Sequence, residues 1–414
     1  MKLNIKYFLA LSVLIFFMFS NEKVFAEEFW DIPVKELSKS GNCSKMISDG
    51  TGKHVYFAYS FQKLNIKRST DYGLNFSSPA QLGSSGVFSS TISTNSTGKY
   101  VYAIWVENEK LFSSVSSDSG KSFIDPIELD SYEEESIIQE PNIISDSSGK
   151  YVYAIWVNNY YNVRMRASSS YGTRWTDIIE ITPSGGKPNI ITDSSGKNVF
   201  VSFDDDSVQV RGSTDFGNTF DKPIILDKTG MRPKIVASSD AKYVYAIWQD
   251  EANNLKFSAS DFGAKWYSSL EFSSLGALTI DLTTNATGQY VYTLWNDENQ
   301  NIQIRVSSDH GEGFSTINLN EKGENPKILT DTTGQFVFIV WLDLDYNIQF
   351  RSSSNFGISF DSKIKLTDTP EAMFTLPDIT IDDEAKFIHI LWNSFDGSIK
   401  TIDGARLLST KDDP

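Results

Sequence analysis

Residues 213–220 of the chain read STDFGNTF, and six other segments repeat this pattern, which has a glycine at its fifth position and an aromatic residue at its end. The other copies are STDYGLNF from Ser69, SSDSGKSF from Ser116, SSSYGTRW from Ser168, ASDFGAKW from Ala259, SSDHGEGF from Ser307 and SSNFGISF from Ser353. Successive glycines lie about 47 residues apart. A fixed period of this length is typical of a repeat protein, whose units bury their apolar faces against one another.

A second pattern, a turn followed by a β-branched and aromatic run, recurs in step with the first. Two of its copies are DSSGKYVYAIW and NATGQYVYTLW, and each reads as a turn that leads into a strand. Its eight copies end at Tyr59, Trp105, Trp156, Phe203, Trp248, Trp295, Trp341 and Trp392. Each period holds four short strands, A to D, and strand A is often opened by a proline. Four strands per repeat predict an all-β propeller of four-stranded antiparallel blades.

The two ends of the repeat array are incomplete in complementary ways. The eighth unit, from Leu376 to Ile402, has three strands but neither the glycine motif nor a fourth strand. Residues 29–34 (FWDIPV) resemble residues 174–179 (RWTDII), which lead into a fourth strand. We therefore predict eight blades within one domain, residues 27–414, closed by an N-terminal strand in the last blade. The irregular end after Gly404 leaves the blade count open by one.

The N-terminus carries the features of a secretory signal. Lys2 and Lys6 precede an apolar run over residues 7–19, and Val24-Phe25-Ala26 forms a small-residue cleavage site. A run of this length is too short to span a bilayer. Residues 1–26 are therefore expected to be a signal peptide, and the mature protein is expected to be secreted, periplasmic or at the cell surface, without a membrane span.

Charge and cysteine content narrow the possible partners. The formal net charge is −16, and removal of residues 1–26 leaves about −18. Such an acidic chain is not expected to bind nucleic acid, because that binding rests on Lys and Arg neutralising phosphates. Cys43 is the only cysteine, so no disulfide forms within the chain. A glycan or an extracellular protein remains as the expected partner, and a monomer as the expected state.

The glycine motif resembles the Asp box, the bacterial neuraminidase repeat of the sialidase-like superfamily, which reads Ser/Thr-x-Asp-x-Gly-x-x-Trp/Phe. Ser170 and Asn355 replace the acid in two copies, and Ala259 replaces the first serine in another. The structural residues of the boxes are expected to be Asp71, Gly73, Asp118, Gly120, Gly172, Asp215, Gly217, Asp261, Gly263, Asp309, Gly311 and Gly357. The carboxylate caps a turn, and the glycine accepts a positive φ.

The resemblance implies that these boxes lie at the C–D turns, on the propeller face opposite the active site of sialidases. Chain topology puts the A–B turns on the same face, and the B–C and D–A connections on the other. That second face is rich in acids and in length variation, as in the connections 124–140 (with Glu133–Glu135) and 361–376. We expect the ligand there, and the candidate binding residues are Tyr160, Tyr161, Asp204, Asp205, Asp206, Asp250, Asp297, Asp343 and Arg232. Each acid alone is also explained by solubility.

The arginine pattern argues against a typical sialidase. Those enzymes hold a substrate carboxylate with three arginines, and their Arg-Ile-Pro motif is absent here. One position is occupied by arginine in four repeats, as Arg166, Arg211, Arg305 and Arg351, and this repetition favours a structural role for them. The aromatic residues that end the eight B strands also repeat, so they too are expected to be structural. Only Arg164 and Arg232 are expected near the B–C face. No catalytic residue is assigned.

Two function classes follow from these observations. The first is a binding module that recognises a glycan or protein through its acidic loop face, where charge reversal of Asp297 and Asp343 should weaken capture without lowering the melting temperature. The second is a glycoside hydrolase, either a divergent exo-sialidase or an enzyme with paired carboxylates. A purely structural surface protein is a third possibility. No cofactor or metal is expected. Calcium binding by the clustered acids Asp204, Asp205 and Asp206 is left open, although no EF-hand-type ligand spacing is present.

Overall fold

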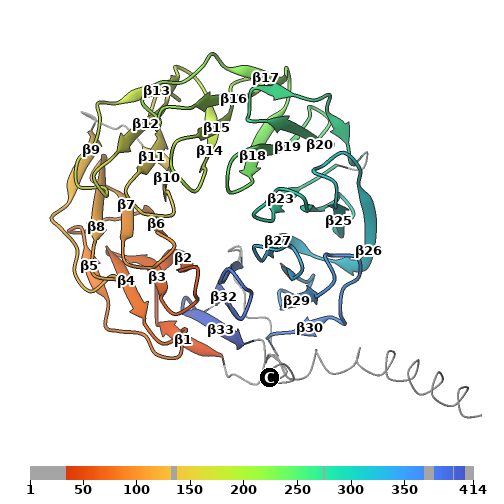
Figure 1. Ribbon diagram of the computed structural model, residues 1–414. Coiled ribbons are helices and arrows are strands. Elements are labelled where there is room, and N and C mark those ends of the chain that lie inside the picture. The colour runs from red at the N-terminus through yellow and green to blue at the C-terminus, as the bar shows by residue number, and fades with distance from the viewer. Residues whose placement is uncertain (1–33, 132–137, 274–275, 368–376, 395, 406–414) are drawn as a thin grey trace, which may run out of the picture.

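The computed structural model is a ring of eight antiparallel sheets around a common axis (Figure 1). Residues of the inner strands line an opening near this axis, which we call the channel. It describes residues 34–131, 138–273, 276–367, 377–394 and 396–405, and every regular element in these ranges is a β-strand. The all-β propeller with eight blades is thus confirmed. Within each blade we name the strands A to D from the channel outward.

The first four blades follow the predicted order of strands. They comprise β2 (Asn42–Ser48), β3 (Val55–Phe61), β4 (Lys63–Ser69) and β5 (Ala80–Leu82); β6 (Ser89–Thr94), β7 (Val101–Glu107), β8 (Lys110–Ser116) and β9 (Ile127–Ser131); β10 (Gln139–Ser145), β11 (Val152–Val157), β12 (Val163–Ser168) and β13 (Ile179–Thr182); and β14 (Gly186–Thr192), β15 (Val199–Asp204), β16 (Val208–Ser213) and β17 (Ile224–Asp227).

The last four blades repeat the arrangement, with a divided outer strand in blade 5. They comprise β18 (Met231–Ala237), β19 (Tyr243–Gln249), β20 (Leu255–Asp261), β21 (Lys265–Trp266) and β22 (Leu270–Glu271); β23 (Thr279–Thr284), β24 (Val291–Asn296), β25 (Asn301–Ser307) and β26 (Ser315–Lys322); β27 (Glu324–Thr330), β28 (Val337–Leu342), β29 (Ile348–Ser353) and β30 (Ile364–Lys365); and β31 (Asp378–Ile381), β32 (Phe387–Asn393) and β33 (Ile399–Ala405).

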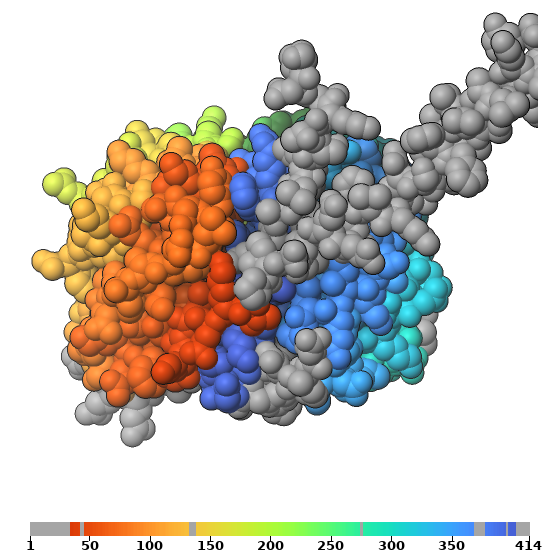
Figure 2. All heavy atoms as spheres, turned by 90° about the horizontal axis from the view of Figure 1, so that it is seen from below, coloured from red at the N-terminus to blue at the C-terminus, as the bar shows by residue number. Residues whose placement is uncertain are grey.

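The ring is closed by the N-terminal strand, as predicted. β1 (Lys35–Ser38) is the outer strand of blade 8 and pairs with β33, so that Lys35 faces Thr401. Figure 2 shows the red N-terminal segment against the blue C-terminal one. The strand follows the segment whose resemblance suggested it, of which residues 29–33 lie outside the described part. With β1 in place, β33 is paired on both edges, with β32 and with β1, so its outer edge is not open to another chain.

A closed circle of backbone hydrogen bonds joins the A–B turns of all eight blades. The second residue of each turn donates its N–H to the carbonyl of the second residue in the next blade's turn. For example, Gly50 N donates to Ser96 O at 3.0 Å, and Asp383 N donates back to Gly50 O at 3.0 Å. The other donors in order are Ser96, Ser147, Ser194, Ser239, Ala286 and Thr332. The circle satisfies eight turn amides that would otherwise need water.

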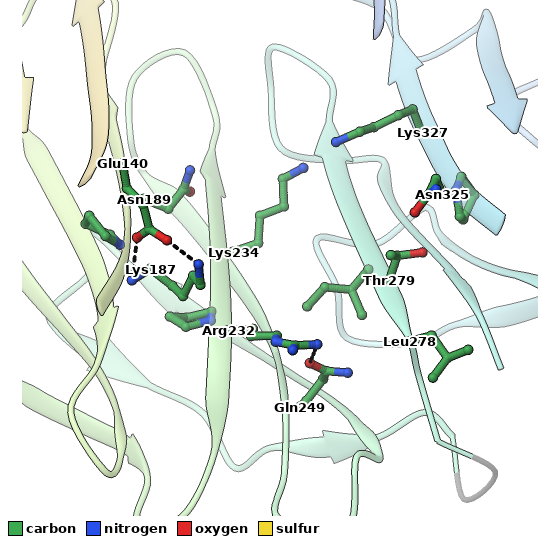
Figure 3. A pocket seen from close by; sticks show the side chains of 14 residues that line it. Glu140, Lys187, Asn189, Arg232, Lys234, Gln249, Leu278, Thr279, Asn325 and Lys327 are labelled. Atoms are coloured by element: carbon green, nitrogen blue, oxygen red, sulfur yellow. Dashed lines mark hydrogen bonds and ion pairs between the residues drawn. The ribbon is translucent and has the colours of Figure 1, made fainter. Parts of the chain in front are cut away.

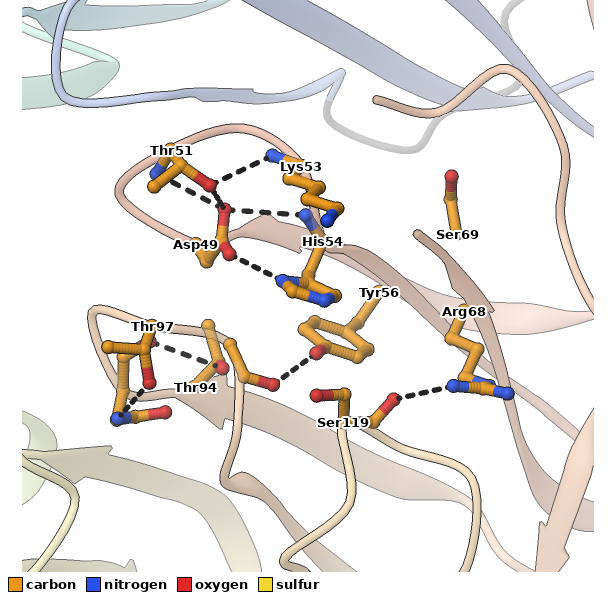
Figure 4. Close-up of polar contacts among 12 residues, drawn as sticks. Asp49, Thr51, Lys53, His54, Tyr56, Arg68, Ser69, Thr94, Thr97 and Ser119 are labelled. Carbon is orange, nitrogen blue, oxygen red and sulfur yellow. Dashed lines mark hydrogen bonds and ion pairs between the residues drawn. The ribbon is translucent and has the colours of Figure 1, made fainter. Parts of the chain in front are cut away.

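The A–B turns are also tied to the neighbouring B strands by tyrosines. Tyr102 Oη donates to Gly149 O at 2.5 Å, and Tyr245 Oη donates to Gly288 O at 2.6 Å, in each case across a blade boundary. Tyr56, Tyr153 and Tyr292 make the same contact. Figure 4 shows it for Tyr56, beneath the turn that Asp49 caps. Each phenol is buried, so its hydrogen bond fixes the position of one blade on the next.

Two blade boundaries replace this hydrogen bond with an apolar contact. The tyrosine is replaced by Phe200 in blade 4 and by Phe338 in blade 7. The glycine of the following turn is replaced by Ala241 and Ala385, which lie in the same hydrophobic clusters as those phenylalanines. A phenylalanine leaves no hydroxyl to satisfy, so the pair of changes keeps the boundary packed.

The ring of B-strand aromatics lies between blades, as its repetition suggested. Trp156 is buried among residues of blade 2, and Trp341 among residues of blade 6. The indole N–H of Trp156 donates to Asp130 at 2.8 Å, and that of Trp248 donates to Asp227 at 2.8 Å, again across blade boundaries. These side chains are buried, so they are not a sugar-stacking platform.

The seven box turns are the C–D turns of blades 1 to 7, and each is hydrogen-bonded to the A–B turn of its own blade. In blade 4, Ser213 Oγ accepts from Gly217 N at 3.0 Å and donates to Asp215 at 2.8 Å, and Asp215 caps Thr219 N at 2.9 Å. In all seven copies the residue before the glycine donates its N–H to an A–B turn carbonyl, as Phe216 does to Lys197 at 3.0 Å. These contacts place the A–B and C–D turns on one face, the Asp-box face.

Blade 5 has a different box turn. Ala259 lacks the hydroxyl that organises the other copies, and the chain forms a tight hairpin in which Asp261 faces Lys265. Asp261 accepts instead from the Tyr267 hydroxyl at 2.6 Å. The loss of one serine oxygen therefore changes the local backbone, because that oxygen caps two amides in blade 4.

Candidate functional site

The inner strands carry a repeated bulge where the channel opens. Glu140, Lys187, Arg232 and Asn325 each precede a proline of strand A and have φ between 48° and 54°. The pairing register shifts at each of these points, for example between Met231 and Lys234. Non-glycine residues in this region of φ are strained, and such strain concentrates at functional sites. The bulges place four polar side chains around the channel (Figure 3).

A hollow of about 760 Å³ lies at this end of the channel, over blades 3 to 5, and we call it the mouth hollow. Three of the bulge residues, Glu140, Lys187 and Arg232, form its inner side. The B–C turns contribute Tyr161, Asp204–Asp206 and Glu251, and the D–A connections contribute Ser184–Gly186 and Thr229–Met231. The B–C and D–A connections thus share one face, the loop face, as chain topology predicted.

Five of the nine candidate binding residues line this hollow. They are Tyr161, Asp204, Asp205, Asp206 and Arg232. Asp204 accepts the backbone N–H of Arg232 at 2.9 Å, and Asp205 accepts the Ser184 hydroxyl at 2.7 Å. Asp206 is exposed and has a φ of 49°. The first two carboxylates support the walls of the hollow, and the third is open to solvent.

A close approach of two backbones shapes the wall of the hollow beside Asp204. Gly185 has a φ of 152°, and a Cβ there would lie 2.9 Å from the Asp204 carbonyl oxygen. Only glycine permits this approach of the D–A connection to the B–C turn.

The two adjacent tyrosines, Tyr160 and Tyr161, sit at the tip of a B–C turn. Their exposed fractions are 70% and 66%, among the highest of the large hydrophobic residues on the ring. Side chains so exposed contribute little to the core, whereas aromatic faces bind sugars and peptides well. Tyr161 borders the mouth hollow.

These tyrosines belong to a turn whose backbone repeats in other blades. Asn158 Oδ1 accepts from Tyr160 N at 2.9 Å and from Asn162 N at 2.8 Å. Blades 5, 6 and 7 have the same turn, in the order Asp-x-x-x-Asn. The backbone is common to four blades, and only the tyrosine side chains are peculiar to blade 3.

The remaining three candidate acids cap these equivalent turns. Asp250 accepts from Asn254 N at 2.8 Å, Asp297 from Asn301 N at 2.9 Å, and Asp343 from Asn347 N at 2.9 Å. Burial alone would raise the pKa of Asp343, but hydrogen bonds from Asn347 and Gln349 leave it below its ordinary value. Their carboxylates are occupied by their own turns, and none of the three lines the mouth hollow.

The arginines do not gather around one point in the mouth hollow. The only arginine among its lining residues is Arg232, whose guanidinium donates to Gln249 Oε1 at 3.4 Å. Arg164 pairs with Asp130 of the preceding blade at 3.3 Å. Arg211 and Arg351 donate to backbone carbonyls of preceding blades, Ile181 O and Leu319 O. These contacts agree with a structural role for the repeated arginines.

Two carboxyl groups with raised pKa lie on the Asp-box face, away from the mouth hollow. Burial raises the pKa of Asp382, and burial together with the Asp382, Asp49 and Glu384 charges raises the pKa of Asp383. Both belong to the A–B turn of blade 8. A general acid at neutral pH needs a raised pKa, but these two groups support a turn, where Asp382 accepts from Phe387 N at 2.7 Å.

Sequence reasoning missed Glu140, Lys187 and Asn325, and it missed the channel as a site. The available signal was the polar residue immediately before the proline of strand A, in the segments QEPN, GKPN, MRPK and ENPK. We also find no group of three or more His, Cys, Asp or Glu side chains in the described ranges that is arranged to hold a metal. Within the same ranges, no helix is long and apolar enough to cross a membrane.

Comparisons with known proteins support the propeller fold and do not identify the chemistry of the site. No protein-family model matches the chain, and no curated protein matches it at the level of sequence. The WD40 domain of SCAP from fission yeast matches with a TM-score of 0.56 and 10% identity, over 91% of this chain and 98% of that one. The BP39L lectin from Burkholderia pseudomallei matches with a TM-score of 0.54 and 11% identity, over 80% and 100%. The likeness is one of fold.

Proposed function

We propose that the protein is a secreted binding module that holds a saccharide in the mouth hollow. The observation that carries this proposal is the combination of two exposed tyrosines with a polar hollow beside them. Saccharides bind by stacking of their apolar faces on aromatic rings and by hydrogen bonds from their hydroxyls to charged and amide side chains. Asp206, Glu251 and Arg232 supply such groups within the hollow.

The scaffold supports the same proposal. Ser–Asp–Gly hydrogen bonding recurs in the box turns, for example around Ser69, Ser116 and Ser307, as expected for Asp boxes of the sialidase-like superfamily. A lectin is among the solved structures that share the fold. The leader-like residues 1–26 support secretion, and N-terminal sequencing of exported protein should then begin at Glu27.

The test is binding of the mature chain to a glycan array, followed by titration of the best saccharide. We expect the double variant Y160A/Y161A to lose at least about tenfold in affinity, because stacking contributes about 1–3 kcal/mol. Tyr346→Ala is the matched control, because Tyr346 occupies the turn position of Tyr161 in blade 7 but lies outside the hollow. Equal losses in both variants, or no glycan bound at all, would overturn the proposal.

Glycoside hydrolysis is the second candidate, because several carboxylates border the same hollow. An inverting or retaining glycosidase needs two of them on opposite sides of the bond that is cleaved. Sugar released from a bound glycan by the wild-type protein, and not by Asp206→Asn or Glu251→Gln, would favour hydrolysis. Binding without release keeps the protein as a binding module.

A further inference from the structure

A second polar ring lines the channel one step deeper than the bulges. Its members occupy equivalent positions in strand A, as shown by their B-strand partners: Lys234 faces Ile247, Asp281 faces Leu294, and Lys327 faces Val340. The eight positions are Lys45, Thr91, Asn142, Asn189, Lys234, Asp281, Lys327 and Asp378. Lysine and aspartate alternate through blades 5, 6, 7, 8 and 1, and the other three blades carry neutral residues.

Both aspartates of this ring are fully engaged. Asp281 Oδ2 accepts from Ile328 N of the next blade at 2.8 Å, and its other oxygen accepts from Lys234. Asp378 also accepts one amide and one ammonium, but both come from blade 1: Met46 N at 3.1 Å and the Lys45 ammonium at 3.3 Å. Asp281 therefore links blades 5, 6 and 7, Asp378 links blades 8 and 1, and each aspartate neutralises one lysine.

Lys327 is the third lysine of the ring, and neither ring aspartate forms an ion pair with it, because Asp378 pairs with Lys45 and Asp281 pairs with Lys234. In the described part of the chain it has neither a hydrogen bond nor an ion pair, although Asp281 and Asp378 act on it from a distance. Lys234 and Lys327 extend into the opening from β18 and β27 (Figure 3). The Asp281 charge alone would raise the pKa of Lys327, but the Lys234 ammonium and burial leave it below its ordinary value.

The bulge layer above the ring holds another surplus cation. Lys187 pairs with Glu140, but the guanidinium of Arg232 contacts only the neutral amide of Gln249 among the described residues. Arg232, Lys234 and Lys327 line one hollow of about 400 Å³ within the channel, which we call the channel hollow and which is distinct from the mouth hollow. Counting each ion pair as neutral, this hollow has an excess of two positive charges inside a chain whose net charge is −16.

We propose that this channel hollow binds one tetrahedral oxyanion with two negative charges, a phosphate or sulfate group, between Lys327, Lys234 and Arg232. Such a group would separate two ammonium groups that otherwise repel, and its charge matches the excess. Each ammonium has three N–H donors, and Lys234 uses one of them in its hydrogen bond to Asp281. Lysine is a common phosphate ligand because its ammonium acts as a compact charge.

The oxyanion site does not require a saccharide in the mouth hollow, although Arg232 lines both hollows. The oxyanion has two possible sources, a free ion and a substituent of a bound sugar. A sugar phosphate that binds more tightly than inorganic phosphate, with the difference lost in Y160A/Y161A, assigns the anion to the sugar. Equal affinities assign it to the free ion.

Calorimetric titration of the mature chain with inorganic phosphate, at constant ionic strength in chloride, tests the proposal. We expect one phosphate per chain, and Lys327→Met should weaken its binding about tenfold or more, as expected for loss of a charged hydrogen bond. Lys121→Met is the matched control, because it removes an exposed lysine from the Asp-box face. Y160A/Y161A should keep its phosphate affinity, which separates this site from the proposed saccharide site.

The folded state gives a second readout. Lys327→Met relieves repulsion, so without phosphate its melting temperature should equal or exceed that of the wild type, while phosphate should no longer raise it. Arg232→Met provides a second variant with the same expected loss of affinity. The proposal is overturned if the wild-type chain binds no phosphate, if an adventitious ion only is found with no dependence on Lys327 or Arg232, or if Lys121→Met weakens binding equally.

Discussion

The two faces of the ring differ in which of their features repeat. On the Asp-box face, every A–B turn takes part in one hydrogen-bonded circle, and all seven box turns are tied to it. On the loop face, four B–C turns share a backbone, but their side chains range from tyrosine to aspartate. A position that must hold two blades together is constrained in every blade. A position that contacts only solvent or a ligand is free to differ, so the ligand is sought where repetition stops.

The largest expected effect sharpens this comparison with two glycines. Gly217 in a box turn has φ +72°, and a Cβ would lie 2.9 Å from the Tyr153 ring, whereas Gly86 on the loop face has φ +86° with no atom within 4 Å. We expect Gly217→Ala to lower the free energy of unfolding by about 3 kcal/mol, and Gly86→Ala by about 1 kcal/mol from the backbone alone. Denaturant unfolding measures both. Equal losses would show that the two faces are equally constrained.

The loop face has constrained points of its own, and Asp297 is one of them. The side chain is 2% exposed and caps Asn299 N and Asn301 N at 2.9 Å each. Asp297→Lys should therefore cost about 2 kcal/mol of stability, which reverses the sequence-based expectation of an unchanged melting temperature. Asp297→Asn keeps the accepting oxygen, as Asn158 does in blade 3, and should cost well under half of that. A thermal shift assay checks both. Equal melting temperatures for Asp297→Lys and wild type would show that Asp297 is not a constrained position of the loop face.

A blade boundary on the Asp-box face provides the next comparison. Tyr245→Phe removes the hydroxyl that donates to Gly288 O at 2.6 Å and leaves a buried carbonyl unpaired. We expect a loss of about 1 kcal/mol in the free energy of unfolding. The double variant Y245F/G288A copies the natural pair Phe200 and Ala241 and tests whether an apolar contact compensates. If the double variant is no more stable than additivity predicts, the two substitutions are independent.

The smallest expected effect is a pH dependence of the box turns. Burial alone would raise the pKa of Asp118, but hydrogen bonds from Ser122 and Ser116 bring it down to about 2. The unfolded carboxyl titrates near pH 3.9, so this stabilisation is present above that pH and is lost as the pH falls toward 2. Asp118→Asn should lower stability at pH 6 by about 0.5 kcal/mol. The difference from wild type should vanish near pH 2, and a difference that grows at low pH would contradict the assignment.

The fold was predictable because its determinants lie within one repeat. The spacing of Gly73 to Gly357 and the strand ending at Trp392 with no box after it predicted eight blades to within one, and the resemblance of residues 29–34 to residues 174–179 predicted closure by the N-terminus. The assignment of the two faces followed from strand order alone. Each of these inferences needed only local patterns and the rule that successive strands pair.

The site was less accessible to sequence reasoning, because its residues converge from different blades. Lys234, Asp281 and Lys327 are each unremarkable within their own repeats, and their surplus of charge exists only once three inner strands meet. The acids of the B–C turns were conspicuous in the sequence, yet Asp250, Asp297 and Asp343 proved to cap turns. Tyr161 was found because its side chain breaks the repeat, and Asp206 and Arg232 because strand order placed them on the loop face; all three line the mouth hollow.

The strand that completes blade 8 has a consequence for biogenesis. Of the strands in the described ranges, β1 is synthesised first and its partner β33 last, so Lys35 can pair with Thr401 only after almost the whole polypeptide has been made. Contacts this distant along the chain form slowly, and until then β33 has an uncovered outer edge that can recruit a second chain. A truncated or stalled chain that lacks one of these two strands should therefore be prone to pair with a neighbouring chain.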